Sequence, residues 1–145
     1  MQPRESRPGM LTRARAMLFH EHTSPLELSI GVGLGVFIGL TPFYMLHTLL
    51  AAGLAWMFRL NIGAAVLGTQ VSNPFFAPGM IAASLWIGHA MAPGAGQPDT
   101  WNPADLDFYV SWLRGGLVLG ILLGTTLGLL TYVAASLARR RKRHA

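Results

Sequence analysis

Two short polar patches interrupt the most apolar part of this sequence, and each contains a proline. Their hydroxyl and amide side chains can hydrogen-bond a polar headgroup, or the backbone groups that a proline leaves without a partner. The residues are Thr41 and Pro42 in the first patch, and Thr69, Gln70, Ser72, Asn73 and Pro74 in the second. Broken helices at membrane depth are tolerated where protein or a wet cavity satisfies the freed groups. The sequence therefore predicts a binding site at the two interruptions, and the alternative is that these side chains only satisfy the backbone.

A third candidate is Arg59, which is followed closely by Asn61. An arginine between two apolar segments can hold a phosphate through two parallel hydrogen bonds. The alternative is an interfacial arginine that sets the topology and extends its charge into the headgroup layer. Both interpretations place Arg59 at a membrane surface.

Histidines and carboxylates offer little for catalysis. His47 and His89 lie inside apolar segments, where an ionisable residue is a candidate for proton coupling unless its neutral ring simply hydrogen-bonds a neighbouring helix. His20 and His22 are two residues apart and point to different sides of a helix, so no metal site is predicted. The sequence contains no common catalytic motif and no paired carboxylates within an apolar segment. We therefore expect neither enzyme activity nor a cofactor.

The composition indicates a membrane protein. Of the 145 residues, 52% are hydrophobic and 12% are charged, and the mean hydropathy is +0.42. Residues 28–58, 60–96 and 115–138 contain no Asp, Glu, Lys or Arg. Uncharged apolar stretches of this length are typical of membrane insertion, and they leave no polar face for a soluble helical bundle.

The fold class we expect is all-α, a polytopic membrane protein with about four apolar helical segments. Ser24, Pro25 and Glu27 form a capping-box pattern that begins the first segment, at about residues 26–40. The second segment lies at 44–58. Together, the first two segments form either two short spans joined outside or a re-entrant hairpin whose tip stops near the midplane. The third, at 61–91, is broken at Asn73-Pro74, and the fourth covers 109–137.

Charge placement predicts the orientation and the domain organisation. Basic residues precede the first segment, Arg59 lies between the second and third segments, and a basic run closes the chain at 139–143. In contrast, the only charged residues in 92–108 are aspartates. By the positive-inside rule, both termini are cytoplasmic. The predicted parts are a basic amphipathic arm at 1–23, a membrane domain at 24–138 with an external acidic loop at 92–108, and a basic tail at 139–145. A basic run directly after an apolar helix is typical of a membrane anchor that attracts anionic lipids, so no nucleic-acid partner is expected.

Glycines at intervals of four form two rows, each along one helical face. Removing side chains at this spacing lets another helix approach closely. The members are Gly31, Gly35 and Gly39 in one row, and Gly116, Gly120, Gly124 and Gly128 in the other. The rows pack helices of one chain or serve an interface with other chains, and with so few segments we expect a homo-oligomer or a larger membrane complex.

Several motifs between residues 24 and 91 resemble a known family. They are Ser24-Pro25 before a glycine-rich helix, the sequence GVFIGLTPF at 35–43, Arg59-Leu60-Asn61, and GTQVSNPF at 68–75. Their order and spacing are similar to those of the bacterial membrane domain of unknown function 2062. The resemblance implies a bacterial inner-membrane location and a role in the cell envelope, and it supplies no catalytic residues.

The leading functional hypothesis is a small inner-membrane protein that binds or translocates an amphipathic lipid or a polyprenyl-phosphate-like carrier. It uses the two interruptions and Arg59, and membrane lipids are its expected ligands. The alternative hypothesis is a structural or assembly subunit that docks onto a larger membrane complex through its glycine rows.

Overall fold

The computed structural model describes residues 24–43, 45–92 and 102–143, and over these residues the protein is all-helical with no strand. The helices are α2 (Pro25–Gly39), α3 (His47–Met57), α4 (Ile62–Gly68), the 3-10 helix η1 (Thr69–Ser72), α5 (Ala77–Ala90) and α6 (Leu106–Arg143). The predicted all-α fold class is confirmed. The amphipathic arm predicted at 1–23 lies outside the described residues.

The capping box that begins α2 is present as predicted. The Glu27 amide donates to the Ser24 side chain at 3.1 Å, and the Ser24 amide donates to the Glu27 carboxylate at 3.2 Å. Pro25 occupies the first turn, where its missing N–H costs nothing. At the other end, Pro42 prevents the helix from continuing, and α2 stops at Gly39.

The segment predicted at 61–91 is broken at Asn73-Pro74, but it is divided further than the sequence suggested. It forms α4, then one turn of tighter 3-10 helix, and then α5, which resumes only at Ala77. Asn61 caps α4 by accepting a hydrogen bond from the Ala64 amide at 2.8 Å. The second segment is also shorter than predicted, because α3 begins at His47 and has 11 residues.

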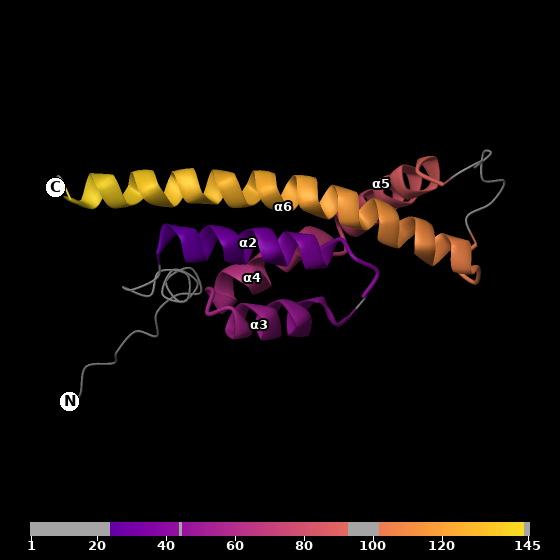
Figure 1. Cartoon of the computed structure of the whole chain (residues 1–145), viewed down its shortest axis with the longest axis horizontal. Coiled ribbons are helices and arrows are strands. Elements are labelled where there is room, and N and C mark those ends of the chain that lie inside the picture. The colour runs from indigo at the N-terminus through magenta and orange to yellow at the C-terminus, as the bar shows by residue number, and fades with distance from the viewer. Residues whose placement is uncertain (1–23, 44, 93–101, 144–145) are drawn as a thin grey trace, which may run out of the picture.

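The long helix α6 lies alongside α2 and α5 (Figure 1). It contacts α5 along its first part and α2 along the following part, and α3 and α4 pack against α2. Neighbouring residues give the register of α2 against α6: Leu40 lies beside Gly116, Gly33 beside Gly124, and Ser29 beside Gly128, so the two helices are antiparallel. By the same argument α5 is antiparallel to α6, and α4 is parallel to α2.

Helix length distinguishes α6 from the other described helices. It has 38 residues, and it is the one helix in the described part of the chain that is long and apolar enough to cross a membrane by itself. Its most apolar window is only 17% buried within the chain. The 15 residues of α2 rise about 22 Å, which is less than the ~30 Å of a hydrocarbon core.

The boundaries of α6 differ from those predicted for the fourth segment. The helix begins at Leu106, so the last turn assigned to the external loop at 92–108 is helical. It also continues to Arg143, so most of the basic tail at 139–145 extends the same helix. Cationic side chains near a helix C-terminus interact favourably with its carbonyl end, which fits a helix that continues into a basic run.

Candidate functional site

The two interruptions predicted as a site are brought together by the fold. The end of α2 packs on η1, and a side-chain carbon added at Gly39 would lie 3.2 Å from Ser72 Oγ. The Ser72 hydroxyl donates a hydrogen bond to the Gly39 carbonyl. Two patches about thirty residues apart in the sequence therefore form one junction.

The end of α2 also receives a hydrogen bond from α3. The carbonyl oxygen of Thr41 lies 2.8 Å from His47 Nε2. A carbonyl can only accept, so in this contact Nε2 carries the proton. The Thr41 hydroxyl itself donates to the Ile38 carbonyl at 2.6 Å, within its own last turn. Side chains thus hydrogen-bond carbonyls at and just beyond the end of the helix.

Two more polar residues of the second patch, Thr69 and Asn73, also hydrogen-bond the backbone. Thr69 Oγ1 donates to the Val66 carbonyl at 2.7 Å. Asn73 Oδ1 accepts from the amides of Phe75 and Phe76 at 2.9 and 3.2 Å, which begins the turn into α5. Gln70 and Pro74 are exposed, and Pro42 is half-buried. The hydroxyl and amide groups of the junction are therefore largely engaged in holding the interrupted backbone.

Arg59 is not part of this junction. It is exposed in the turn between α3 and α4, where its backbone has the left-handed φ of 55°. Asn61, two residues later, packs beside Gly31, whereas Ser72 packs beside Gly39 at the other end of α2. Eight helical residues, or about 12 Å, separate these two levels. The structure thus divides the predicted site residues between two ends of α2.

Both glycine rows face helices of the same chain. Gly31 and Gly35 pack on α4 and Gly39 on η1, whereas Gly120, Gly124 and Gly128 pack on α2. A carbon added at Gly124 would lie 2.7 Å from the Gly33 carbonyl oxygen, so the helices approach as closely as backbone allows. Neither row is left open as a docking face.

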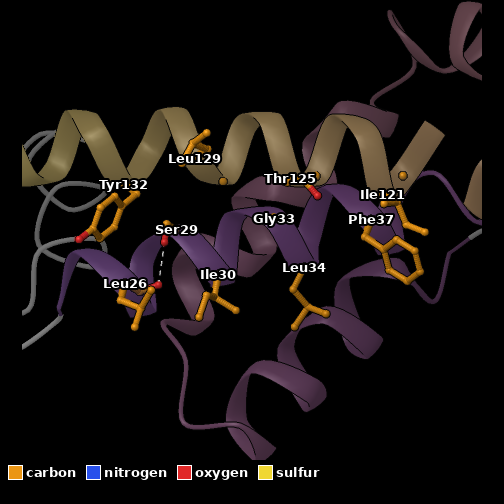
Figure 2. Close-up of a pocket in the computed structure, with 13 residues that line it drawn as sticks. Leu26, Ser29, Ile30, Gly33, Leu34, Phe37, Ile121, Thr125, Leu129 and Tyr132 are labelled. Atoms are coloured by element: carbon orange, nitrogen blue, oxygen red, sulfur yellow. Dashed lines mark hydrogen bonds between the residues drawn. The ribbon is translucent and has the colours of Figure 1, made fainter. Parts of the chain in front are cut away.

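A groove with a volume of about 570 Å³ lies between α2 and α6 (Figure 2). Four residues of α2 and four of α6 form its walls, and both sets follow the same i, i+4, i+8, i+11 spacing. They are Leu26, Ile30, Leu34 and Phe37 on α2, and Ile121, Thr125, Leu129 and Tyr132 on α6. Gly33 and three α6 glycines also line the groove, and their missing side chains leave room between the two walls. We call this feature the α2–α6 groove.

Sequence reasoning missed the α2–α6 groove, although one signal could have indicated it. Gly33 lies on a different face of α2 from Gly31 and Gly35, and it is the residue that meets Gly124. A glycine on the face of a helix opposite to a glycine row indicates a second helical neighbour. The wall residues would then follow from the four-residue spacing on each side.

The described residues hold no group of three or more His, Cys, Asp or Glu that could bind a metal ion. Among the groove residues, hydroxyls are the only polar side chains, from Ser29, Thr125 and Tyr132. The Ser29 hydroxyl donates to the Leu26 carbonyl at 2.8 Å. The groove is therefore suited to a hydrocarbon chain.

Comparison with protein families gives one match. A family model described as an uncharacterised protein conserved in bacteria, DUF2062, covers residues 10–144. The match extends well beyond the stretch from 24 to 91 on which the sequence resemblance rested. No curated protein and no solved structure matches the chain.

Proposed function

The chain belongs to the DUF2062 family of uncharacterised proteins conserved in bacteria, and from this premise we propose that it is an inner-membrane protein that binds an anionic amphipathic lipid. The hydrocarbon chain of the lipid lies in the α2–α6 groove, and its headgroup lies toward the basic end of α6. The observation that carries the proposal is the groove itself, which is apolar, open and bounded by regularly spaced side chains.

Exposed apolar residues support the membrane location. Met45 is 91% exposed, and Trp56 and Trp86 are 75% and 74% exposed. In water, each square ångström of such surface costs about 25 cal/mol, whereas in lipid it costs nothing. A chain with so much uncovered apolar surface is stable where acyl chains replace water.

Aromatic and charged residues on α6 support a placement of the membrane along this helix. Trp112 and Arg114 lie near one end of its apolar stretch, and Tyr132 lies near the other. Twenty residues separate Trp112 from Tyr132, which corresponds to about 30 Å, the thickness of a hydrocarbon core. Trp and Tyr are enriched at both interfaces, and Arg114 and Tyr132 are exposed whereas Trp112 is buried within the chain, so the exposed pair supports membrane surfaces near these two levels.

This placement favours one of the two topologies that the sequence left open. Leu40, at the end of α2, lies beside Gly116, only four residues from Trp112. The tip between α2 and α3 therefore reaches the outer interface instead of stopping at the midplane. We propose two short spans joined there, followed by a third through α4 and η1 and a fourth through α6.

A single cysteine tests this topology, because the sequence has none of its own. Met45→Cys lies at the exposed tip, and we expect a membrane-impermeant maleimide to label it in intact cells. Arg59→Cys is the matched site on the opposite surface and should be labelled only after permeabilisation. Labelling of neither site in intact cells, with both labelled in detergent, would contradict a tip at the outer surface.

The groove then lies in the inner leaflet. It extends along α6 from Gly120 to Tyr132, about 18 Å, and half of a ~30 Å core is about 15 Å. Arg140 and Arg141 follow Tyr132 by two to three turns and are exposed. A lipid chain seated in the groove thus presents its headgroup on the side of these cations, which attract anionic headgroups.

Native mass spectrometry of the purified protein tests lipid binding directly. We expect a retained lipid, with anionic phosphatidylglycerol preferred over zwitterionic phosphatidylethanolamine. Each basic residue near an anionic surface contributes about 1 kcal/mol, so replacing both Arg140 and Arg141 by Gln should reduce the preference by about 2 kcal/mol, or roughly thirtyfold. Arg114→Gln, an exposed arginine at the other end of α6, is the control and should leave the preference unchanged.

The alternative function, docking through the glycine rows, has no open row among the described residues. An oligomer of this chain therefore requires another surface.

Purified protein that carries no lipid under gentle extraction would argue against lipid binding.

A further inference from the structure

A second, much smaller cavity lies where the two interruptions meet. Its volume is about 10 Å³, which is near the minimum that one water molecule needs. Gly39, Leu40, His47, Ser72, Ser84 and Trp112 line it together with apolar residues of α5. The cavity is thus bounded by the end of α2, by α3, by η1, by α5 and by α6.

One polar group lining this cavity lacks a protein partner. Ser84, on α5, is fully buried, and its hydroxyl oxygen has no hydrogen bond to any described residue. Leaving a buried hydroxyl without a partner costs about 1–3 kcal/mol, so native proteins satisfy such groups with protein or with ordered water.

We propose that a single water molecule binds in this cavity and hydrogen-bonds Ser84 Oγ and Ser72 Oγ. The Ser72 hydroxyl already donates to the Gly39 carbonyl, and its remaining lone pairs can accept from water. The water can in turn accept from the Ser84 hydroxyl. It links α5 to η1, and through Ser72 to the end of α2.

The competing arrangement is a rotation of the Ser84 hydroxyl onto the carbonyl of Met80, one turn earlier in its own helix. Serines in helices often make this bond, and it leaves the cavity dry. The two arrangements predict different effects of removing the hydroxyl. A bound water would lose one of its two protein partners, which lowers stability. In the dry arrangement, the hydroxyl only adds a second bond to a helical carbonyl, so its loss costs little. This inference does not depend on what the α2–α6 groove binds.

Thermal unfolding of Ser84→Ala in detergent micelles distinguishes them. A bound water predicts a midpoint about 3 °C lower than that of the native protein, since one hydrogen bond to a buried group is lost. A midpoint that is unchanged or raised would overturn the proposal. Thr131→Val is the control, because that threonine lines neither cavity and its hydroxyl donates to the Leu127 carbonyl of its own helix, so the midpoint should change by less than about 1 °C.

The direct test is an experimental structure of the protein in lipid nanodiscs at a resolution that reveals ordered water. We expect density within about 3 Å of Ser84 Oγ and Ser72 Oγ in the native protein. The same density should be weak or lost in Ser84→Ala. A dry cavity in the native protein, with Ser84 Oγ directed at the Met80 carbonyl, would refute the bound water whatever the unfolding data show.

Discussion

Replacing Gly115 by Ala is expected to lower the stability of the protein by about 3 kcal/mol, which is at the upper end of the cost of overpacking. At Gly115, α6 packs directly on the backbone of α5. Its added methyl group would overlap the Ser84 carbonyl oxygen and would lie 2.6 Å from the carbonyl carbon and 2.8 Å from the Gly88 amide nitrogen. These are backbone atoms of α5, so they cannot move aside as a side chain can, and α5 must separate from α6.

The controls are two glycines that also lie within helices but meet nothing. A methyl group at Gly53 in α3 or at Gly79 in α5 has no neighbour within 4 Å. There the usual preference of a helix for Ala over Gly applies, so both variants should be as stable as the native protein or up to ~1 kcal/mol more stable. Thermal midpoints in detergent should therefore fall by roughly 10 °C for Gly115→Ala and stay level or rise for the controls. Equal midpoints for all three variants would mean that α5 does not pack on α6 as closely as the structure shows.

Local signals predicted the start of α2 and the break at Asn73-Pro74. Ser24, Pro25 and Glu27 act through contacts within four residues, so their pattern alone indicates the start of α2. Asn73-Pro74 likewise ends η1, because proline removes a donor and the asparagine side chain accepts the next amides. Such features need no knowledge of what lies beside them.

The placement of the site residues could not be predicted in the same way. Arg59 and the interruptions were grouped into one site because all are polar residues among apolar neighbours. Their separation along α2 depends on the register of α4 against that helix, which the small residues Gly31, Ala64, Ala65 and Gly68 determine by backbone contact. The sequence shows that small residues are present but not which of them meet.

The role of the polar residues at the two interruptions also could not be predicted from the sequence alone. Thr41, Ser72 and Asn73 were candidates for ligand binding or for satisfying the backbone, and the sequence supports both. In the structure their side chains contact carbonyls and amides of the interrupted segments. The α2–α6 groove, in contrast, is built from ordinary aliphatic residues whose importance depends only on the pairing of two distant helices.

Filling the α2–α6 groove should abolish most lipid binding without changing the fold. Leu129 forms part of the α6 wall and is 62% exposed, so the chain leaves space around it. In Leu129→Trp, the indole ring occupies part of the groove and displaces two to three methylene groups of a bound chain. Each buried methylene contributes about 0.8 kcal/mol, so the loss is about 2 kcal/mol, or roughly thirtyfold in affinity.

The matched control is the next residue along the same helix. Leu130 is 60% exposed, nearly the same as Leu129, but it does not line the groove. Leu130→Trp therefore adds the same ring to the same helix and should bind lipid as the native protein does. Titration of each variant with phosphatidylglycerol, followed by native mass spectrometry, compares the two affinities directly. If both variants lose lipid equally, the tryptophan acts through general surface properties of α6; if neither does, the lipid binds elsewhere, and the α2–α6 groove is only a packing feature between two helices.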